Sequence, residues 1–194
     1  MTNPGPHLFW ITSRASGTAA LVVAGASVTV GLSIGGKLIK RRGGDLRALH
    51  EALSLAAIAA ILFHGLALLG DPYLHPGLAG VFVPFAGRYR PLWTGIGIVG
   101  AWGLALLGLS YYARGRIGQR RWRAAHRFTA LFWALGIVHT LGSGTDAKTT
   151  WYLALVAALT IPPLIMLFTR LAATGQRWTA VRRPGPAIRD HGAG

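Results

Sequence analysis

The sequence predicts an all-α integral membrane protein, built as a bundle of about five transmembrane helices. Hydrophobic residues make up 52% of its 194 residues and charged residues only 13%, a composition typical of membrane proteins. A helix needs about 20 apolar residues to cross the hydrocarbon core of a bilayer. Five charge-free stretches meet or nearly meet this length, and they are apolar on all sides: 15–36, 52–70, 91–113, 128–145 and 149–169.

The first two stretches carry local signals that fit helices in a bundle. Small residues in "AGASVTVG", within the first stretch, suit close packing against another helix. The second stretch follows "GGDL", where two glycines end the preceding helix and Asp45 is expected as the N-cap.

Prolines mark the later stretches and the long loop between the second and third. Pro91 is expected in the first turn of the third helix. Pro162 and Pro163 predict a kink in the fifth, which a bundle tolerates where neighbours satisfy the freed carbonyls. The loop "DPYLHPGLAGVFVPFAGRYR" holds three prolines and several apolar residues, so we expect it to fold back over the outer face.

Basic residues lie on alternate connections and orient the chain. The formal net charge is +15, and the segments 37–47, 114–127 and 170–189 carry sixteen of the twenty lysines and arginines. If the five helices alternate in direction, these segments share one side, which the positive-inside rule assigns to the cytoplasm. The N-terminus is then outside and the C-terminus cytoplasmic. A nucleic-acid-binding patch would not be divided among alternate loops of an apolar protein, so we expect the lipid bilayer and no nucleic acid as surroundings.

We expect one domain, residues 1–172, followed by a short basic cytoplasmic tail. This tail, residues 173–194, has too little apolar content to fold. The chain has no cysteine, which excludes disulfides, thiolate metal sites and thiol catalysis. The N-terminus lacks the charged region and cleavage site of a signal peptide, so its apolar stretch is expected to be a retained helix.

Four histidines occupy matched depths on the second and fourth predicted helices. His50 and His64 are 14 residues apart in "HEALSLAAIAAILFH", and His126 and His139 are 13 apart in "HRFTALFWALGIVH". On ideal helices these separations are about 21 and 19.5 Å. Because both helices run from inside to outside, His50 should face His126 near the inner side, and His64 should face His139 near the outer side.

This pairing predicts a site for two stacked haems. Ionisable groups inside membrane helices are costly and usually mark a function or an internal partner. Two imidazoles facing each other across a bundle can hold a haem iron from both sides, with apolar walls around the macrocycle. Two alternatives stay open. The histidines could be hydrogen-bonded or interfacial residues without a ligand, or they could bind a transition metal or relay protons in a transporter or scaffold.

The second spacing raises a geometric problem. At about 100° per residue, 13 residues leave His139 some 140° from the face of His126 on an ideal helix. Tilt of the helix, or a distortion near Gly136, would have to align the two rings.

At these histidines the chain resembles the ferric reductase-like transmembrane family, which includes the membrane halves of NADPH oxidases and of metalloreductases. The family has two helices whose histidines are separated by thirteen and by twelve intervening residues, and both spacings occur here. The stretches "DPYLHPGLAGVFVPFAGRYRPLW" and "HTLGSGTD" are similar to small bacterial members. The resemblance covers residues 9–171.

The resemblance implies a bacterial plasma membrane protein with two haems b. Its iron ligands would be His50 and His126 for the inner haem, and His64 and His139 for the outer haem. Phe132 and Trp133 fall midway between the ligands of one helix, where family members place aromatic residues between the haems; ordinary packing is the alternative. Arg14 resembles a family arginine near the outer haem, with a propionate as its partner, and the alternative is an arginine that snorkels to the interface.

The resemblance further implies a transmembrane electron carrier with no catalytic residue of its own. Family enzymes often continue into a flavin- and nicotinamide-binding module, which residues 171–194 cannot build. The expected donor is therefore a cytoplasmic flavoprotein reductase or quinol. The acceptor at the outer face would be ferric iron, dioxygen or a partner protein, and Tyr73 and His75 in the outer loop could touch it. A runner-up is the haem subunit of a two-component quinol- or flavoprotein-linked repair reductase. Family members with six helices have an additional first helix, and we do not expect this sequence to contain it.

The charge asymmetry makes a topology prediction. A reporter fused after Gly194 should be active only in the cytoplasm, and one fused before Met1 only outside, because three basic segments share one side. Paired enzymatic and fluorescent reporters at both positions measure this. The opposite pattern of activity would reverse inner and outer for every residue named above.

Overall fold

The computed structural model describes residues 7–36 and 43–181, and over these ranges the chain is helical with no strand. The elements, in chain order, are α1 (Leu8–Gly36), α2 (Gly43–Leu69), α3 (Gly77–Phe82), α4 (Pro91–Leu109), the 3-10 helix η2 (Ser110–Ala113), α5 (Arg114–Ile117), α6 (Gln119–His126), α7 (Thr129–Ser143) and α8 (Thr150–Val181). Four helical segments within the described residues are long and apolar enough to cross a membrane: Leu8–Gly36, Gly44–Leu69, Pro91–Ile117 and Thr150–Arg170. By the length and composition of these helices, the chain is a multi-pass membrane protein.

The fifth predicted span is shorter than the sequence suggests. α7 has 15 residues, fewer than the about 20 that a helix needs to cross the hydrocarbon core. It is separated from α6 by an interruption at residues 127–128, and it ends where Gly144 takes an extended conformation. The prediction of about five spanning helices is thus confirmed for four of them.

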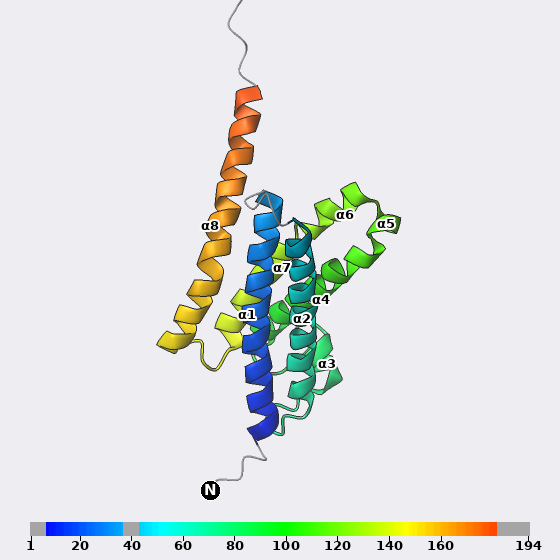
Figure 1. The fold of residues 1–194 in the computed structure, drawn as a ribbon. Coiled ribbons are helices and arrows are strands. Elements are labelled where there is room, and N and C mark those ends of the chain that lie inside the picture. Colours follow the sequence, from blue (N-terminus) through cyan, green and yellow to red (C-terminus); the bar gives the residue numbers. More distant parts are fainter. Residues whose placement is uncertain (1–6, 37–42, 182–194) are drawn as a thin grey trace, which may run out of the picture.

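Two helix pairs make up the body of the molecule. α1 packs along α2, α4 packs along α7, and α8 packs against α1 (Figure 1). Direct contacts between α2 and α4, and between α1 and α7, are much less extensive. The end of the bundle that contains α3 and the start of α1 is called the α3 end, and the end that contains α5 and α6 is called the α6 end (Figure 1).

A small core lies at the middle of the bundle. Its buried members come from four helices and are Leu21 and Ala24 of α1, Ala57 of α2, Trp133 and Ile137 of α7, and Tyr152 and Val156 of α8. Gly25, one of the small residues of α1, lies opposite Leu159 of α8, where an added Cβ would be 3.4 Å from the Leu159 Cβ. By contrast, only 11% of the membrane-length window of α2 is buried, so most of this helix is on the surface of the bundle.

Of three helix boundaries predicted from the sequence, one is confirmed and two differ in the structure. α2 begins at Gly43, so Asp45 lies in its first turn rather than at the N-cap. The negative charge of Asp45 interacts favourably there with the positive end of the helix dipole. α4 begins at Pro91 as predicted. α8 stays one helix through Pro162 and Pro163 and continues to Val181, so the first part of the predicted tail is helical. Residues 182–194 lie outside the described residues.

The loop between α2 and α4 folds back on the bundle, as predicted. Its helix α3 packs against α2, where Val81 lies beside Gly65, and the Trp102 indole of α4 donates to the Phe82 carbonyl at 2.9 Å. Buried Asp71 holds the start of the loop, because its Oδ1 accepts backbone N–H groups from Tyr73 and Leu74. The loop thereby closes the α3 end of the bundle.

Candidate functional site

Two histidine pairs bridge the helix pairs. The ring centroids of His50 and His126 are 6.1 Å apart with an interplanar angle of 87°, and those of His64 and His139 are 6.4 Å apart at 70°. The first pair lies toward the α6 end and the second toward the α3 end. The structure therefore brings together the two pairs that the spacing predicts.

Backbone carbonyls of α1 hold both histidines of α2. Nδ1 of His50 lies 3.0 Å from the Ser27 carbonyl oxygen, and Nδ1 of His64 lies 2.7 Å from that of Ser13. A carbonyl oxygen can only accept, so both Nδ1 atoms carry the proton and donate it. Each ring thus keeps Nε2 as a free acceptor, which is the protonation that a metal-ligating imidazole needs.

A repeat in α1 matches the repeat in α2. Ser13 and Ser27 are 14 residues apart, the same separation as their partners His64 and His50, because the two helices are antiparallel neighbours. Glycines follow each serine by four residues. A Cβ at Gly17 would lie 2.9 Å from the His64 ring, and one at Gly31 would lie 2.9 Å from the His50 ring. Only glycine leaves room for the imidazoles at these two positions.

His139 is held in the same way by α4. Its Nδ1 lies 3.0 Å from the Trp93 carbonyl oxygen, and its ring fills the space where a Cβ at Gly97 would sit. Three of the four histidines therefore share one arrangement: a donated Nδ1 hydrogen bond to a neighbouring helix, with a glycine four residues further along that helix.

His126 is the exception. Its buried Nδ1 has no hydrogen-bond partner of normal geometry, although the backbone of Leu107 interacts with it. Its ring stacks instead on Trp122, with centroids 5.0 Å apart and planes inclined by 27°. α6 ends at His126, so this ring is held by its own short helix more than by α4.

The break after His126 explains how two histidines 13 residues apart reach their partners. The Phe128 N–H donates to the Ala125 carbonyl at 3.0 Å, a tighter turn than in an α-helix, and Thr129 Oγ1 donates to the His126 carbonyl at 2.7 Å. His126 and His139 thus belong to separate helices, α6 and α7, and ideal rotation does not apply. The distortion lies at residues 127–128 and not near Gly136, which sits within regular α7.

The spacing of the rings fits a shared metal ion. Because a metal–imidazole bond is about 2 Å long and the ring centre lies about 1 Å beyond the nitrogen, two imidazoles on one ion have centroids about 6 Å apart. Directly packed aromatic rings also reach such distances. In the pair of His64 and His139 the protonation favours an ion, since both rings donate from Nδ1 and two acceptor Nε2 atoms have no hydrogen to share.

The four histidines are half-buried, so their rings are partly accessible at the surface of the bundle. In residues 7–36 and 43–181 no three His, Asp or Glu side chains cluster as a metal site. A haem needs only two protein ligands, because the porphyrin supplies the other four nitrogens.

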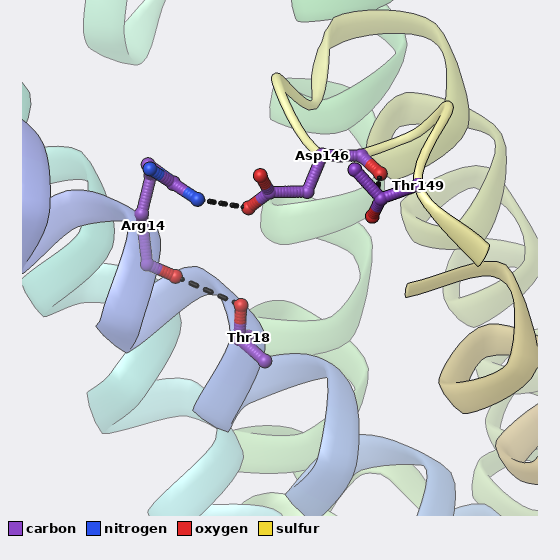
Figure 2. A network of polar contacts seen from close by, with 4 residues as sticks. All are labelled: Arg14, Thr18, Asp146 and Thr149. Atoms are coloured by element: carbon purple, nitrogen blue, oxygen red, sulfur yellow. Dashed lines mark hydrogen bonds and ion pairs between the residues drawn. The ribbon is translucent and has the colours of Figure 1, made fainter. Parts of the chain in front are cut away.

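Arg14 has a protein partner at the α3 end. Its guanidinium forms an ion pair with Asp146 in the α7–α8 loop (Figure 2). The guanidinium carbon also lies 4.3 Å from the centroid of the Trp10 ring. Side chains support both partners: Thr18 donates to the Arg14 carbonyl at 3.0 Å and Thr149 to the Asp146 carbonyl at 2.7 Å. In the structure the partner of Arg14 is thus the Asp146 carboxylate, and the ion pair ties α1 to the α7–α8 loop. The haem propionate that the resemblance implies as its partner stays a prediction.

The two aromatic residues predicted between the pairs point to different neighbours. Trp133 is 4% exposed and belongs to the central core with Ala57. Phe132 instead presses on α4, where its ring fills the position of a Cβ at Gly103. Trp133 thus lies between the histidine pairs and Phe132 fixes the α4–α7 contact. Tyr73 and His75 are exposed on the loop before α3.

No family model, curated protein or solved structure matches the chain. The resemblance to ferric reductase-like membrane domains therefore stays a prediction that rests on the histidine spacing.

Sequence reasoning identified the histidines but missed the groups that hold them. The signal was present in α1, where serine and glycine repeat at the 14-residue interval of His50 and His64. Asp146 carried no comparable signal, because its partner Arg14 lies on another element. Trp122 precedes its partner His126 by four residues on the same helix, a spacing that the sequence does show.

The glycine beside His139 makes a stability prediction. Gly97→Ala should lower the free energy of unfolding by about 1–3 kcal/mol, because the added Cβ overlaps the His139 ring. Gly136→Ala on α7 is the control. Nothing lies within 4 Å of its added Cβ, so it should be stabilising by about 0.5–1 kcal/mol. Unfolding of both variants in detergent micelles measures the difference, and equal effects would contradict the contact.

Proposed function

We propose that this chain is a transmembrane b-type cytochrome that carries electrons across a bacterial plasma membrane between two haems. One observation carries the proposal. Two histidine pairs face each other at ring separations of 6.1 and 6.4 Å, and hydrogen bonds fix Nδ1 as the protonated nitrogen in three of the four rings. The resemblance in histidine spacing supports the same conclusion.

Each pair would hold one haem. His50 and His126 would ligate the haem at the α6 end, and His64 and His139 the haem at the α3 end. Haem supplies one-electron chemistry, which the protein tunes and orients. The role of the Ser13, Ser27 and Trp93 carbonyls is to fix the imidazoles in one protonation state and one orientation.

The region between the pairs favours passage of electrons over passage of ions. Trp133 and Ala57 belong to a core there that consists mainly of apolar side chains. A transporter or proton relay would need polar groups along that route. A large indole placed between two redox groups shortens the distance over which an electron must tunnel through space.

The basic α6 end would be the cytoplasmic side and would receive the donor. Exposed Arg116, Arg120, Arg121 and Arg123 lie on α5 and α6, within the segment that ends at His126. This charge favours an acidic flavoprotein reductase, with quinol as the other donor. The acceptor, ferric iron, dioxygen or a partner protein, would meet the α3 end near the loop that carries Tyr73 and His75.

Ligand substitution tests the proposal directly. His50→Ala or His126→Ala should remove one haem, and His64→Ala or His139→Ala should remove the other, because each iron would lose one of two protein ligands. The loss is measured as the number of haems per chain and from the low-spin signals in electron paramagnetic resonance. His75→Ala, on an exposed loop, is the matched control and should keep both haems.

The pattern of loss also decides the pairing. If His50→Ala and His64→Ala removed the same haem, the assignment of ligands to pairs would be wrong. A folded wild-type chain without haem would end the proposal as a whole.

The donor makes a second prediction. NADPH gives a hydride, whereas haem takes single electrons, so a flavin is needed between them. The purified 194-residue chain should therefore be reduced by dithionite and not by NADPH alone, and an acidic flavoprotein reductase should restore reduction. Stopped-flow absorption at rising salt measures the rate, which should fall if the arginines of α5 and α6 guide docking. Fast reduction by NADPH without flavin would contradict the need for a partner.

A further inference from the structure

The histidine pair at the α6 end is asymmetric in how its two rings are held. His50 donates Nδ1–H to the Ser27 carbonyl, and Ser27 Oγ also lies 3.2 Å from the same nitrogen. Nδ1 of His126 has no hydrogen-bond partner of normal geometry. The Leu107 carbonyl, which occupies the place that Trp93 has for His139, accepts from the Ser110 hydroxyl at 2.7 Å. The Leu107 backbone also interacts with the His126 ring, but without a hydrogen bond of normal geometry.

Trp122 supplies the contact that this ring otherwise lacks. Its indole stacks on the His126 imidazole with centroids 5.0 Å apart, and both residues lie on the same short helix α6. Two contacts from η2 fix the indole: its Nε1 donates to Ser110 Oγ at 3.2 Å, and its ring meets Tyr111 edge-on at 5.8 Å. A chain of contacts therefore runs from the end of α4 through Ser110 and Trp122 to His126.

We propose that Trp122 is the positioning residue for His126, and that this makes His126 the most easily released of the four ligands. This inference rests on the proposed haem function. Stacking fixes the plane of a ring, but Nδ1 of His126 then has only the contact with the Leu107 backbone and no hydrogen bond of normal geometry. An imidazole without such a hydrogen bond gives less electron density to a metal. The bond from His126 to the iron is thus weaker than that from His50, and it depends on an indole rather than on a backbone carbonyl.

The test compares three variants of the haem-loaded full chain. Trp122→Leu removes the stack, Trp122→Phe keeps an aromatic ring there, and Trp151→Leu changes an exposed tryptophan of α8 as control. Trp122→Leu should release one of the two haems to excess apomyoglobin about 10- to 100-fold faster than the wild type, the range found when supporting groups of metal ligands are removed. Its reduced form should also bind carbon monoxide at one haem. Trp122→Phe and Trp151→Leu should behave as the wild type does.

Each outcome is decisive. Unchanged haem release and no carbon monoxide binding in Trp122→Leu would overturn the positioning role, while two haems in the wild type would leave the proposed function standing. If Trp122→Leu does not fold, Trp122→Met decides, because it removes the aromatic stack while a long apolar side chain still fills the space. That variant should shift one low-spin resonance signal, and an unchanged spectrum would overturn the inference.

Discussion

The backbone carbonyls of one helix hold the imidazoles of the next, and most of the site follows from this contact. Ser13 and Ser27 of α1 accept Nδ1–H from His64 and His50, and Trp93 of α4 does so from His139. A carbonyl within a helix already accepts one hydrogen bond and has a second lone pair to offer. The imidazoles can use it only if the helices approach closely, which explains the glycines at 17, 31 and 97. The protonation of the histidines, the distance between the helices and the positions of the glycines therefore all follow from this one contact.

The same contact shapes the bundle. Because α1 is bound to α2 and α4 to α7, the molecule consists of two tightly packed pairs that meet mainly at the histidines and at a small core around Trp133. Three of the four histidines at this seam are held by their Nδ1 atoms, and the fourth, His126, is held by its stack on Trp122. The Arg14–Asp146 ion pair then closes the α3 end by joining α1 to the start of α8.

Most of the architecture could be predicted from charge-free length and from the histidine spacing. Apolar length is a strong signal for a spanning helix, and four spans follow from it. The break at residues 127–128 could not be predicted, because neither Arg127 nor Phe128 ends a helix by its own chemistry. It is set by contacts of His126 with Trp122 and of Thr129 with the His126 carbonyl. The pairing of Arg14 with Asp146 could not be predicted either, because the two residues are far apart in the chain and Asp146 lies in a short loop.

The measurement that tests the central claim most directly is the reduced-minus-oxidised absorption spectrum of the purified chain, together with its haem content. The account predicts two haems b per chain, with the sharp bands of low-spin iron held by two histidines. A folded, monodisperse chain that binds no haem, even when haem is supplied during synthesis, would contradict it. The paired imidazoles would then be an edge-to-face contact between helices rather than ligands.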